Sequence, residues 1–214
     1  FSGPVILDEV QRVPDLFSYV QTSVDQDDSP GRFILSGSQN FLLLKSVSQS
    51  LAGRCAILHL LPFSLNELES RRPIKISSIG HGLPRRRSAG DADVMKTLFR
   101  GFYPRIHDKD LEPQRWLRDY YQTYVERDVR EIVNVGDIET FGRFERLCAG
   151  RNGQLLNLSS LANDCGVTHT TAKRWLSVLE ASFLILLLRP HHRNFSKRLI
   201  KTPKLYFLDS GLLC

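Results

Sequence analysis

The hydrophobic pattern begins with two short, uninterrupted apolar runs, Val5–Leu7 and Phe33–Leu35. The run Val5–Leu7 predicts a strand that is buried on both faces, as in a parallel sheet, and Arg32–Gly37 is predicted to be the second strand. Between them, Pro14 opens a predicted helix that has Phe17 and Val20 on its apolar side. The order strand, helix, strand predicts a right-handed crossover between two parallel strands.

The next stretch predicts two further elements and a short helix. Phe41–Leu44 is apolar and predicts a helix, and Cys55–Leu61 predicts a third strand that ends at Pro62. Ser64 begins the short helix, because Glu67 stands three residues later in the capping-box position.

Residues 71–93 interrupt this pattern, since they hold few large apolar side chains and many Arg, Ser, Gly and Pro residues. Such a composition indicates a linker or mobile loop. We therefore expect an α/β domain at residues 1–70 and a second domain at 94–214. The triplet Arg85–Arg87 could contact phosphates, although such runs are more often simply solvated.

The second domain is predicted to be mainly α-helical. Glu112–Ile132 carries apolar and tyrosine side chains at helical spacing, with charged residues on its other side. We expect the tyrosines in the core, because a base-stacking platform needs exposed aromatics beside a basic groove. Asp137 caps a further predicted helix, which has Phe141, Phe144 and Leu147 on one face.

Residues 158–180 have the pattern of a helix-turn-helix, in which Gly166 suits a left-handed turn. The apolar positions predicted to face inward are Leu161, Ala162, Cys165, Ala172, Trp175, Leu176 and Leu179. The polar and basic residues left facing outward are Thr168, His169, Thr170, Thr171, Lys173 and Arg174. Base edges and phosphates call for such side chains at the start of a recognition helix, so these are the candidate DNA contacts.

Two later apolar runs, Phe183–Leu188 and Lys204–Leu208, would supply the strands of a wing. With them, residues 155–210 or so would form a winged helix-turn-helix. Many winged-helix units only hold proteins together, so DNA contact and protein contact both stay open for this segment.

The composition is that of an ordinary soluble globular chain, with 42% hydrophobic and 24% charged residues among 214. A formal net charge of +6 is compatible with an anionic partner without specifying one. The four cysteines form no Cys-x-x-Cys pair and lie beside apolar segments, so we expect reduced, mostly buried thiols of a cytoplasmic protein. The longest apolar run is too short to cross a bilayer, and no membrane partner is expected.

Candidate chemistry follows the predicted strands, at the end where parallel sheets bind ligands. Asp8 and Glu9 follow the first strand, where one acid would hold a magnesium shell and the other would orient or deprotonate a water. Ser36 and Ser38 follow the second strand, where a hydroxyl could sense a γ-phosphate. Arg54 follows a small-residue turn and could neutralise charge during phosphoryl transfer, in its own subunit or in a neighbour's. Taken alone, the two acids could also be solvated ends of a core strand.

These segments together resemble a known family. The first motifs are Val5–Pro14 (Val-Ile-Leu-Asp-Glu-Val-Gln-Arg-Val-Pro), Arg32–Gln39, Leu51–Arg54 and Leu61–Ser64. They are similar to the second half of the core in a prokaryotic AAA-type P-loop ATPase family. The later motifs are Gly101–Arg105, Tyr124–Arg130, Gly153–Asn157, Trp175–Ser182 and Lys204–Gly211. They resemble the uncharacterised C-terminal domain typical of these ATPases, so the resemblance spans nearly the whole chain apart from residues 71–93.

The resemblance implies an α/β part, which is a partial P-loop NTPase sheet, followed by a mainly α part that contains a winged helix. It implies that Asp8 holds Mg²⁺ through water, that Glu9 is the catalytic base, and that Ser38 (or Ser36) is the first sensor. Arg54 becomes a candidate arginine finger. The implied cofactors are ATP and Mg²⁺, and a homo-oligomer is a further expectation. Nucleotide state would reposition the C-terminal domain.

One element of the family is absent from these 214 residues, which contain no Gly-x-x-x-x-Gly-Lys-Ser/Thr motif. That loop supplies the backbone N–H cradle, the phosphate-binding lysine and a magnesium ligand. In the family it lies upstream of the position at which this chain starts, so we expect a fragment that binds ATP weakly or not at all by itself. The alternatives are a DNA-binding module, in which the α/β part is only a scaffold, and a protein-interaction domain.

Overall fold

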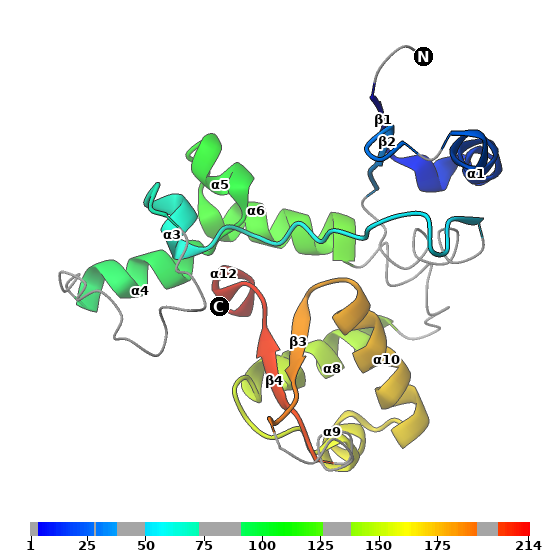
Figure 1. The fold of residues 1–214 in the computed structure, drawn as a ribbon. Helices are drawn as coiled ribbons and strands as arrows, with labels where there is room; N and C mark the ends of the chain where they lie inside the picture. The colour runs from blue at the N-terminus through cyan, green and yellow to red at the C-terminus, as the bar shows by residue number, and fades with distance from the viewer. Residues whose placement is uncertain (1–3, 28, 38–49, 73–90, 126–137, 192–200) are drawn as a thin grey trace. The chain divides into compact units, whose positions relative to one another are not determined.

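The computed structural model describes residues 4–27, 29–37, 50–72, 91–125, 138–191 and 201–214 (Figure 1). The chain divides into two compact units, Phe1–His59 and Leu60–Cys214. Several features predicted from the sequence lie outside the described residues: Ser38, the helix at Phe41–Leu44, most of the linker at 71–93 with the Arg85–Arg87 triplet, and the Asp137 cap.

The first unit is built on two parallel strands, β1 (Val5–Leu7) and β2 (Phe33–Leu35), which pair in register from Val5–Phe33 to Leu7–Leu35. The connection between them contains a 3₁₀ turn, η1 (Val10–Arg12), and an α-helix, α1 (Leu16–Gln26). This confirms the predicted strand, helix, strand order and the parallel pairing. The buried core of the unit consists of Val10, Phe17, Val20 and Leu51.

The prediction that the Val5–Leu7 strand is buried on both faces is wrong for the described structure, and β2 is exposed on one face as well. Ile6 is 69% exposed and Ile34 is 54% exposed, while their neighbours along each strand are half-buried. The half-buried positions pack with the core around α1, and no described element of this unit covers the other face. A short apolar run therefore predicted the strand correctly but not what packs against it.

The predicted strand at Cys55–Leu61 is also absent, since no described residue in this range belongs to a strand. Leu58 is 91% exposed and Leu60 is fully exposed. A strand requires a partner that accepts and donates backbone hydrogen bonds, and no described strand lies beside this segment. The chain then enters α3 (Leu65–Leu68), where the Ser64 and Glu67 capping box is present as predicted.

The second unit begins with helices that gather around the end of the chain. They are α4 (Asp91–Arg100), α5 (Pro104–Asp108), α6 (Pro113–Tyr120), a π-helical turn η3 (Tyr121–Val125) and α12 (Ser210–Leu213). The predicted helix at Glu112–Ile132 is therefore α6 followed by a π-helical turn over its described part. Tyr120 and Tyr121 pack against the hydrophobic core, as predicted for the tyrosines of this helix.

A buried carboxylate fastens α12 to the end of α4. Asp209 is 1% exposed and accepts hydrogen bonds from the backbone N–H groups of Phe102 (2.7 Å) and Leu212 (2.9 Å). Gly101 and Gly211 meet so closely that a Cβ on Gly211 would lie 2.8 Å from the Gly101 Cα. Only glycine fits at this approach, which joins the last helix of the chain to a turn more than a hundred residues earlier.

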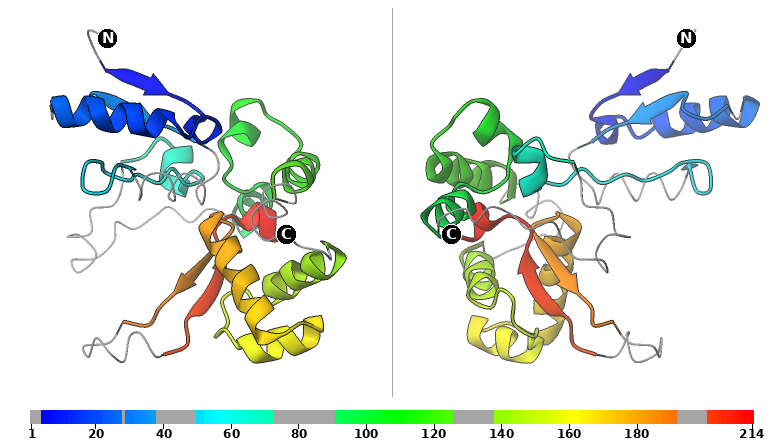
Figure 2. Two further views of the ribbon diagram at one scale, coloured as in Figure 1. Left: turned by 90° about the vertical axis from the view of Figure 1, so that its right-hand side faces the viewer. Right: turned by 60° about the vertical axis from the view of Figure 1, so that its left-hand side comes forward.

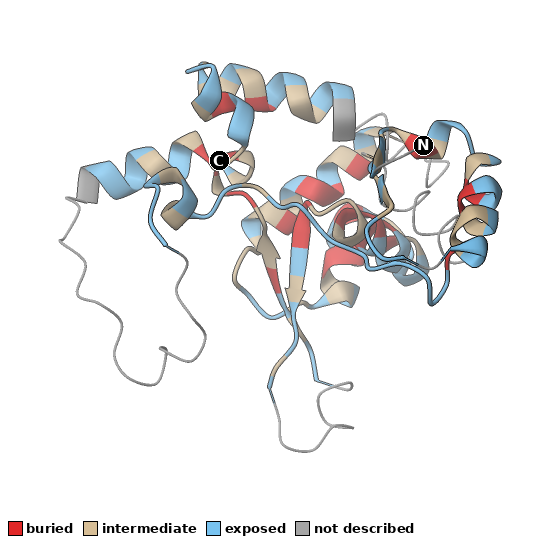
Figure 3. Cartoon of the chain, turned by 45° about the horizontal axis from the view of Figure 1, so that its top comes forward, coloured by how far each residue is buried: buried red, intermediate tan, exposed pale blue. Residues whose placement is uncertain are grey.

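The larger core of the second unit lies between three helices and a hairpin, α8 (Ile138–Gly150), α9 (Leu158–Cys165), α10 (His169–Ala181), β3 (Ile185–Leu188) and β4 (Lys204–Phe207) (Figure 2). β3 and β4 are antiparallel, and Leu155 forms a further bridge to Lys204. Buried residues concentrate on these elements (Figure 3). All seven positions predicted to face inward in this segment are buried.

The local signals of this segment are confirmed residue by residue. Gly166 has a φ of 78° at the end of α9, which is the left-handed conformation predicted for the turn. The side chain of Thr168 accepts a hydrogen bond from the Thr171 backbone N–H and thereby caps α10. Phe141 and Phe144 are buried on α8 and meet the Trp175 ring in edge-to-face contacts.

Candidate functional site

The first candidate site lies where β1 and β2 end. The Ser36 hydroxyl donates a hydrogen bond of 2.6 Å to Oδ1 of Asp8, and both residues are exposed. The strand ladder continues to this point, because Ser36 N–H donates to the Leu7 carbonyl at 2.9 Å and Val10 N–H donates to the Ser36 carbonyl at 3.2 Å. The parallel register therefore brings together two side chains that are 28 residues apart in the sequence.

Glu9 occupies an unusual backbone conformation directly beside this pair. Its φ of 54° and ψ of 37° are left-handed, which costs a non-glycine residue about 1–2 kcal/mol. Such strain is maintained only where the surrounding structure holds it, and it occurs preferentially at functional sites. The Glu9 side chain is 35% exposed, and its Oε2 receives the amide Nε2 of Gln11 at 3.0 Å and the Nε of Arg12 at 3.3 Å.

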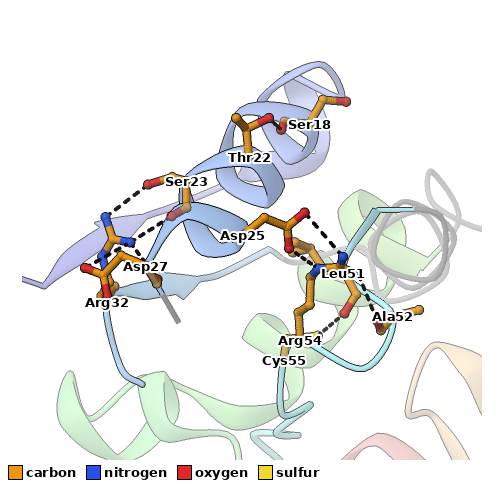
Figure 4. A network of polar contacts seen from close by, with 10 residues as sticks. All are labelled: Ser18, Thr22, Ser23, Asp25, Asp27, Arg32, Leu51, Ala52, Arg54 and Cys55. Atoms are coloured by element: carbon orange, nitrogen blue, oxygen red, sulfur yellow. Dashed lines mark hydrogen bonds and ion pairs between the residues drawn. The ribbon is translucent and has the colours of Figure 1, made fainter. Parts of the chain in front are cut away.

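Arg54 lies towards the opposite end of the strands from Asp8 and Ser36. Its Nε and Nη2 reach the two carboxylate oxygens of Asp25 at 2.5 and 3.3 Å (Figure 4). Asp25 belongs to the last turns of α1, next to the groups that hold Arg32 just before β2 begins. Asp8 and Ser36 lie after the strands end, whereas Arg54 lies near where β2 starts.

The Arg54 guanidinium is held in a fork-to-fork arrangement with a carboxylate. The hydrogen bond to Asp25 and the charge of that carboxylate raise the pKa of Arg54, so the side chain stays protonated. The turn that presents it is anchored by the buried Leu51 and contains Gly53 at a φ of 74°. A planar fork of this kind suits carboxylates and phosphates alike.

The residues at the carboxyl ends of the strands fit Mg²⁺ chemically. Mg²⁺ prefers oxygen ligands and keeps several waters, with one or two carboxylates from the protein. Asp8 offers an exposed carboxylate and Ser36 a hydroxyl, and both are hard oxygen donors. Across the described ranges, no group of three or more His, Cys, Asp and Glu side chains is arranged to hold a metal ion. Ser38, the other predicted sensor, lies outside the described residues.

The second candidate site is the outward face of α10. His169, Thr170, Lys173 and Arg174 are exposed there, as predicted. The hydroxyls of Thr168 and Thr171 bond to each other at 2.9 Å at the helix cap, so these two predicted contacts also have a structural role. Five of the six predicted residues are therefore exposed, and one of these, Thr168, pairs at the cap with the half-buried Thr171.

The hairpin beside α10 is strongly basic. Between Ala181 and Asp209 the sequence contains no acidic residue and six basic ones. Among the described residues of this stretch, Arg189, Lys201 and Lys204 are exposed. Their positive charge lies on elements that follow α10 directly.

Three residues near these sites were not predicted to have a role. Gln11 and Arg12 contact Glu9, and Asp25 holds Arg54. Gln11 and Arg12 stand within the Val5–Pro14 motif, so their position beside the two acids was the available signal. Nothing in the local sequence singles out Asp25, because its contact with Arg54 spans 29 residues.

Comparison with known proteins matches two parts of the chain to family models. Residues 2–69 match the model of an AAA domain, so the N-terminal part is an AAA-type domain. Residues 91–214 match a domain of unknown function, DUF8612. That match covers more than half of the chain, and the chain therefore belongs to the DUF8612 family.

The chain is also similar to uncharacterised proteins of Mycobacterium tuberculosis and Mycobacterium bovis. It is 31% identical to each over 212 residues, which covers 99% of this chain and 44% of the relative. The chain thus spans less than half the length of these curated relatives. No solved structure gives a significant match. None of the helices in the described ranges has the length and apolar character that a bilayer span needs.

Proposed function

We propose that the N-terminal unit supplies the metal-binding and water-activating side of an ATPase site. Asp8 would hold Mg²⁺ through water, and Glu9 would be the catalytic base. The single observation that carries this proposal is the 2.6 Å hydrogen bond from Ser36 to Asp8 at the carboxyl ends of parallel strands. A hydroxyl in contact with the metal-binding acid is well located to respond to a γ-phosphate, which favours Ser36 as the sensor.

The residues divide the chemistry between them. Mg²⁺, when bound with ATP, would neutralise charge on the β- and γ-phosphates. Ser36 fixes the orientation of the Asp8 carboxylate through Oδ1. Glu9 would accept a proton from the water that attacks the γ-phosphorus. Fixed groups of this kind lower the barrier chiefly by positioning and electrostatics.

Arg54 is proposed to act on the nucleotide of a neighbouring subunit. This is supported by its location near the start of β2, away from the Asp8–Ser36 pair, with its guanidinium at the surface and 38% exposed. The proposal requires a homo-oligomer in which the Arg54 edge of one subunit approaches the acids of the next. Nucleotide state would then reposition the C-terminal domain.

The test is ATP hydrolysis by the full-length protein. Glu9→Gln keeps the shape of the side chain but removes the base, so ATP binding should persist while turnover falls by a factor of about 100 or more. Asp8→Asn should raise the Mg²⁺ concentration needed for half-maximal activity. Undiminished hydrolysis by Glu9→Gln would exclude Glu9 as the base.

A second function, nucleic-acid binding, is supported by a different observation. Four exposed polar or basic residues on α10 are followed by a hairpin whose stretch of sequence is basic and free of acids. We propose that α9, α10, β3 and β4 form a winged helix-turn-helix that contacts duplex DNA. Recognition helices of such units enter the major groove, while phosphate contacts come from neighbouring basic side chains.

The DNA proposal predicts salt-dependent affinity. Binding of the chain to a mixed pool of duplexes should weaken linearly on a log–log plot against salt. Replacing Lys173→Ala together with Arg174→Ala should reduce the slope by about 2, because about one counterion is released per phosphate contact. Arg115→Ala with Arg118→Ala removes the same charge from exposed positions on α6 and should leave the slope nearly unchanged.

Fluorescence anisotropy with labelled duplexes measures these slopes. Equal loss of affinity in both double variants would indicate general attraction to a basic protein. Absence of any salt-sensitive binding would leave α8–α10 and the hairpin as a protein-interaction domain.

A further inference from the structure

Gln11 is the residue whose contacts extend the proposed ATPase site. It stands in the middle of η1, the 3₁₀ turn that follows the two acids. The turn directs its side chain back toward Glu9, so that Gln11 Nε2 donates to Glu9 Oε2 at 3.0 Å. This is a partly buried bond between side chains only two residues apart.

The turn that carries Gln11 is fixed to the neighbouring strand. Val10 is 3% exposed, and its N–H donates to the carbonyl of Ser36 on the β2 side. The N–H of Arg12 donates to the Glu9 carbonyl at 3.0 Å and closes the turn. The left-handed backbone of Glu9 is therefore held from both sides, and Gln11 has a defined place relative to the carboxylate.

The two oxygens of Glu9 have different surroundings. Gln11 and Arg12 both donate to Oε2, whereas no described residue donates to Oε1. Arg12 is 75% exposed, so water competes strongly for its contact, while Gln11 is half-buried. Gln11 is therefore the better candidate for fixing the carboxylate.

The amide oxygen of Gln11, Oε1, is buried and lacks a hydrogen-bond donor within the described part of the chain. Buried acceptors in native proteins are paired with a protein donor or an ordered water. Only the amide nitrogen can donate to a carboxylate, and this leaves the amide oxygen beside Glu9 in need of a donor.

We propose that Gln11 is the positioning residue for Glu9. It would hold Oε2 and leave Oε1 for the water that attacks ATP. A proton would pass from that water to Oε1 while the water oxygen bonds to the γ-phosphorus. The bond from the γ-phosphorus to its bridging oxygen breaks, and ADP leaves with that electron pair. This inference rests on the proposed role of Glu9.

The test compares Gln11→Met in two backgrounds of the full-length protein. Methionine keeps the length of the side chain but cannot donate to the carboxylate. In the native background we expect kcat for ATP hydrolysis to fall about tenfold at unchanged KM, because the base is less well oriented. Gln26→Met changes an exposed glutamine at the end of α1 and serves as the matched control with unchanged kcat.

The second background is Glu9→Asp, which shortens the base so that Gln11 no longer reaches it. There Gln11→Met should lower kcat less than twofold, because the contact is already lost. An equal loss in both backgrounds, or no loss in the native one, would overturn the positioning role. Thermal melting, monitored by circular dichroism, checks that each variant is folded. If Gln11→Met does not fold, Gln11→Leu replaces it, because leucine also cannot donate to the carboxylate.

The Glu9→Gln variant separates this inference from the proposed function. If Glu9→Gln hydrolyses ATP at the native rate, the proposed base is wrong and the role of Gln11 falls with it. If Glu9→Gln is inactive but Gln11→Met is fully active, Glu9 remains the base and only the role of Gln11 is excluded.

Discussion

Single residues after the ends of β1 and β2 carry the chemistry proposed for the first unit. The Ser36–Asp8 bond links a hydroxyl to an acid, and Ser36→Ala removes it without emptying any buried space, because Ser36 is exposed. We expect kcat for ATP hydrolysis in the full-length protein to fall about tenfold, with the free energy of unfolding changed by less than about 0.5 kcal/mol.

A matched control for Ser36→Ala exists within the same unit. The Ser29 hydroxyl donates to Asp27 Oδ1 at 2.6 Å, in an exposed loop after α1. Ser29→Ala therefore removes a bond of the same kind and length away from the acids, and its kcat should equal that of the native protein. If both variants lose activity alike, the loss reflects general loosening of the unit.

Cys148 illustrates how a core position alters the chemistry of one residue. Burial, and then the charge of Glu145, raise the pKa of the Cys148 thiol from 9.0 to about 12. Above pH 9 the unfolded chain loses this proton while the folded chain keeps it, so the free energy of unfolding falls as the pH rises from 9 towards 12. Below pH 9 this contribution is constant.

The prediction for Cys148 is measured by urea unfolding across this pH range. Cys148→Ala should show a shallower fall in the free energy of unfolding above pH 9 than the native chain, because the buried thiol no longer contributes. Parallel curves would mean that Cys148 titrates alike in the folded and unfolded states.

At the scale of elements, two glycines in neighbouring helices should respond to alanine with opposite signs. Gly166→Ala should destabilise the chain by about 1 kcal/mol, because its φ of 78° disfavours any Cβ although no atom lies in the way. Gly142 is inside α8, and a Cβ there meets only Arg146 at an ordinary 3.7 Å. Gly142→Ala should therefore stabilise by up to about 1 kcal/mol.

Urea unfolding of the full chain measures both glycine variants. Gly166→Asn is an informative third variant, since asparagine tolerates the left-handed region better than alanine and should recover part of the loss. Destabilisation by Gly142→Ala would show that α8 is more tightly packed at this position than its surroundings indicate.

The helices and strands also show which structural features sequence patterns can predict. Thr168, Gly166 and the Ser64–Glu67 pair were predictable because each acts through hydrogen bonds or dihedral angles within a few residues. The absence of a strand at residues 55–61 was not predictable, because a short apolar run favours an extended chain but cannot supply the partner strand. The burial of Ile6 was predicted wrongly for the same reason, since burial depends on elements far away in the sequence.

The candidate site was predicted only in part. The contacts that were missed depend on backbone conformations and on long-range contacts that the local sequence does not specify. Asp8 and Ser36 could be paired because parallel strands bring their carboxyl ends to one edge. The left-handed backbone of Glu9 carries no sequence signal, since glutamate rarely adopts it. The contact between Arg54 and Asp25 required the actual path of the turn after Leu51.

At the scale of the whole molecule, the proposed function gives this chain one side of a nucleotide site. Its 214 residues contain no phosphate-binding loop motif, and the relatives it matches are more than twice as long. We expect calorimetric titration of this chain with Mg-ATP to give no micromolar binding, because the N–H cradle and lysine contribute much of the affinity for the phosphates. Micromolar binding would show that the 214 residues of this chain suffice for ATP binding without that motif.

The backbone at Glu9 also restricts how this chain can evolve. Selection for heat resistance alone would favour glycine at that position, because glycine adopts a φ of 54° without strain. Under the proposed role of Glu9 as the base, glutamate would be retained there only while the benefit of its carboxylate exceeds that gain. Lineages that have abandoned the reaction should therefore drift towards glycine or asparagine at this position, and lineages that keep it should not.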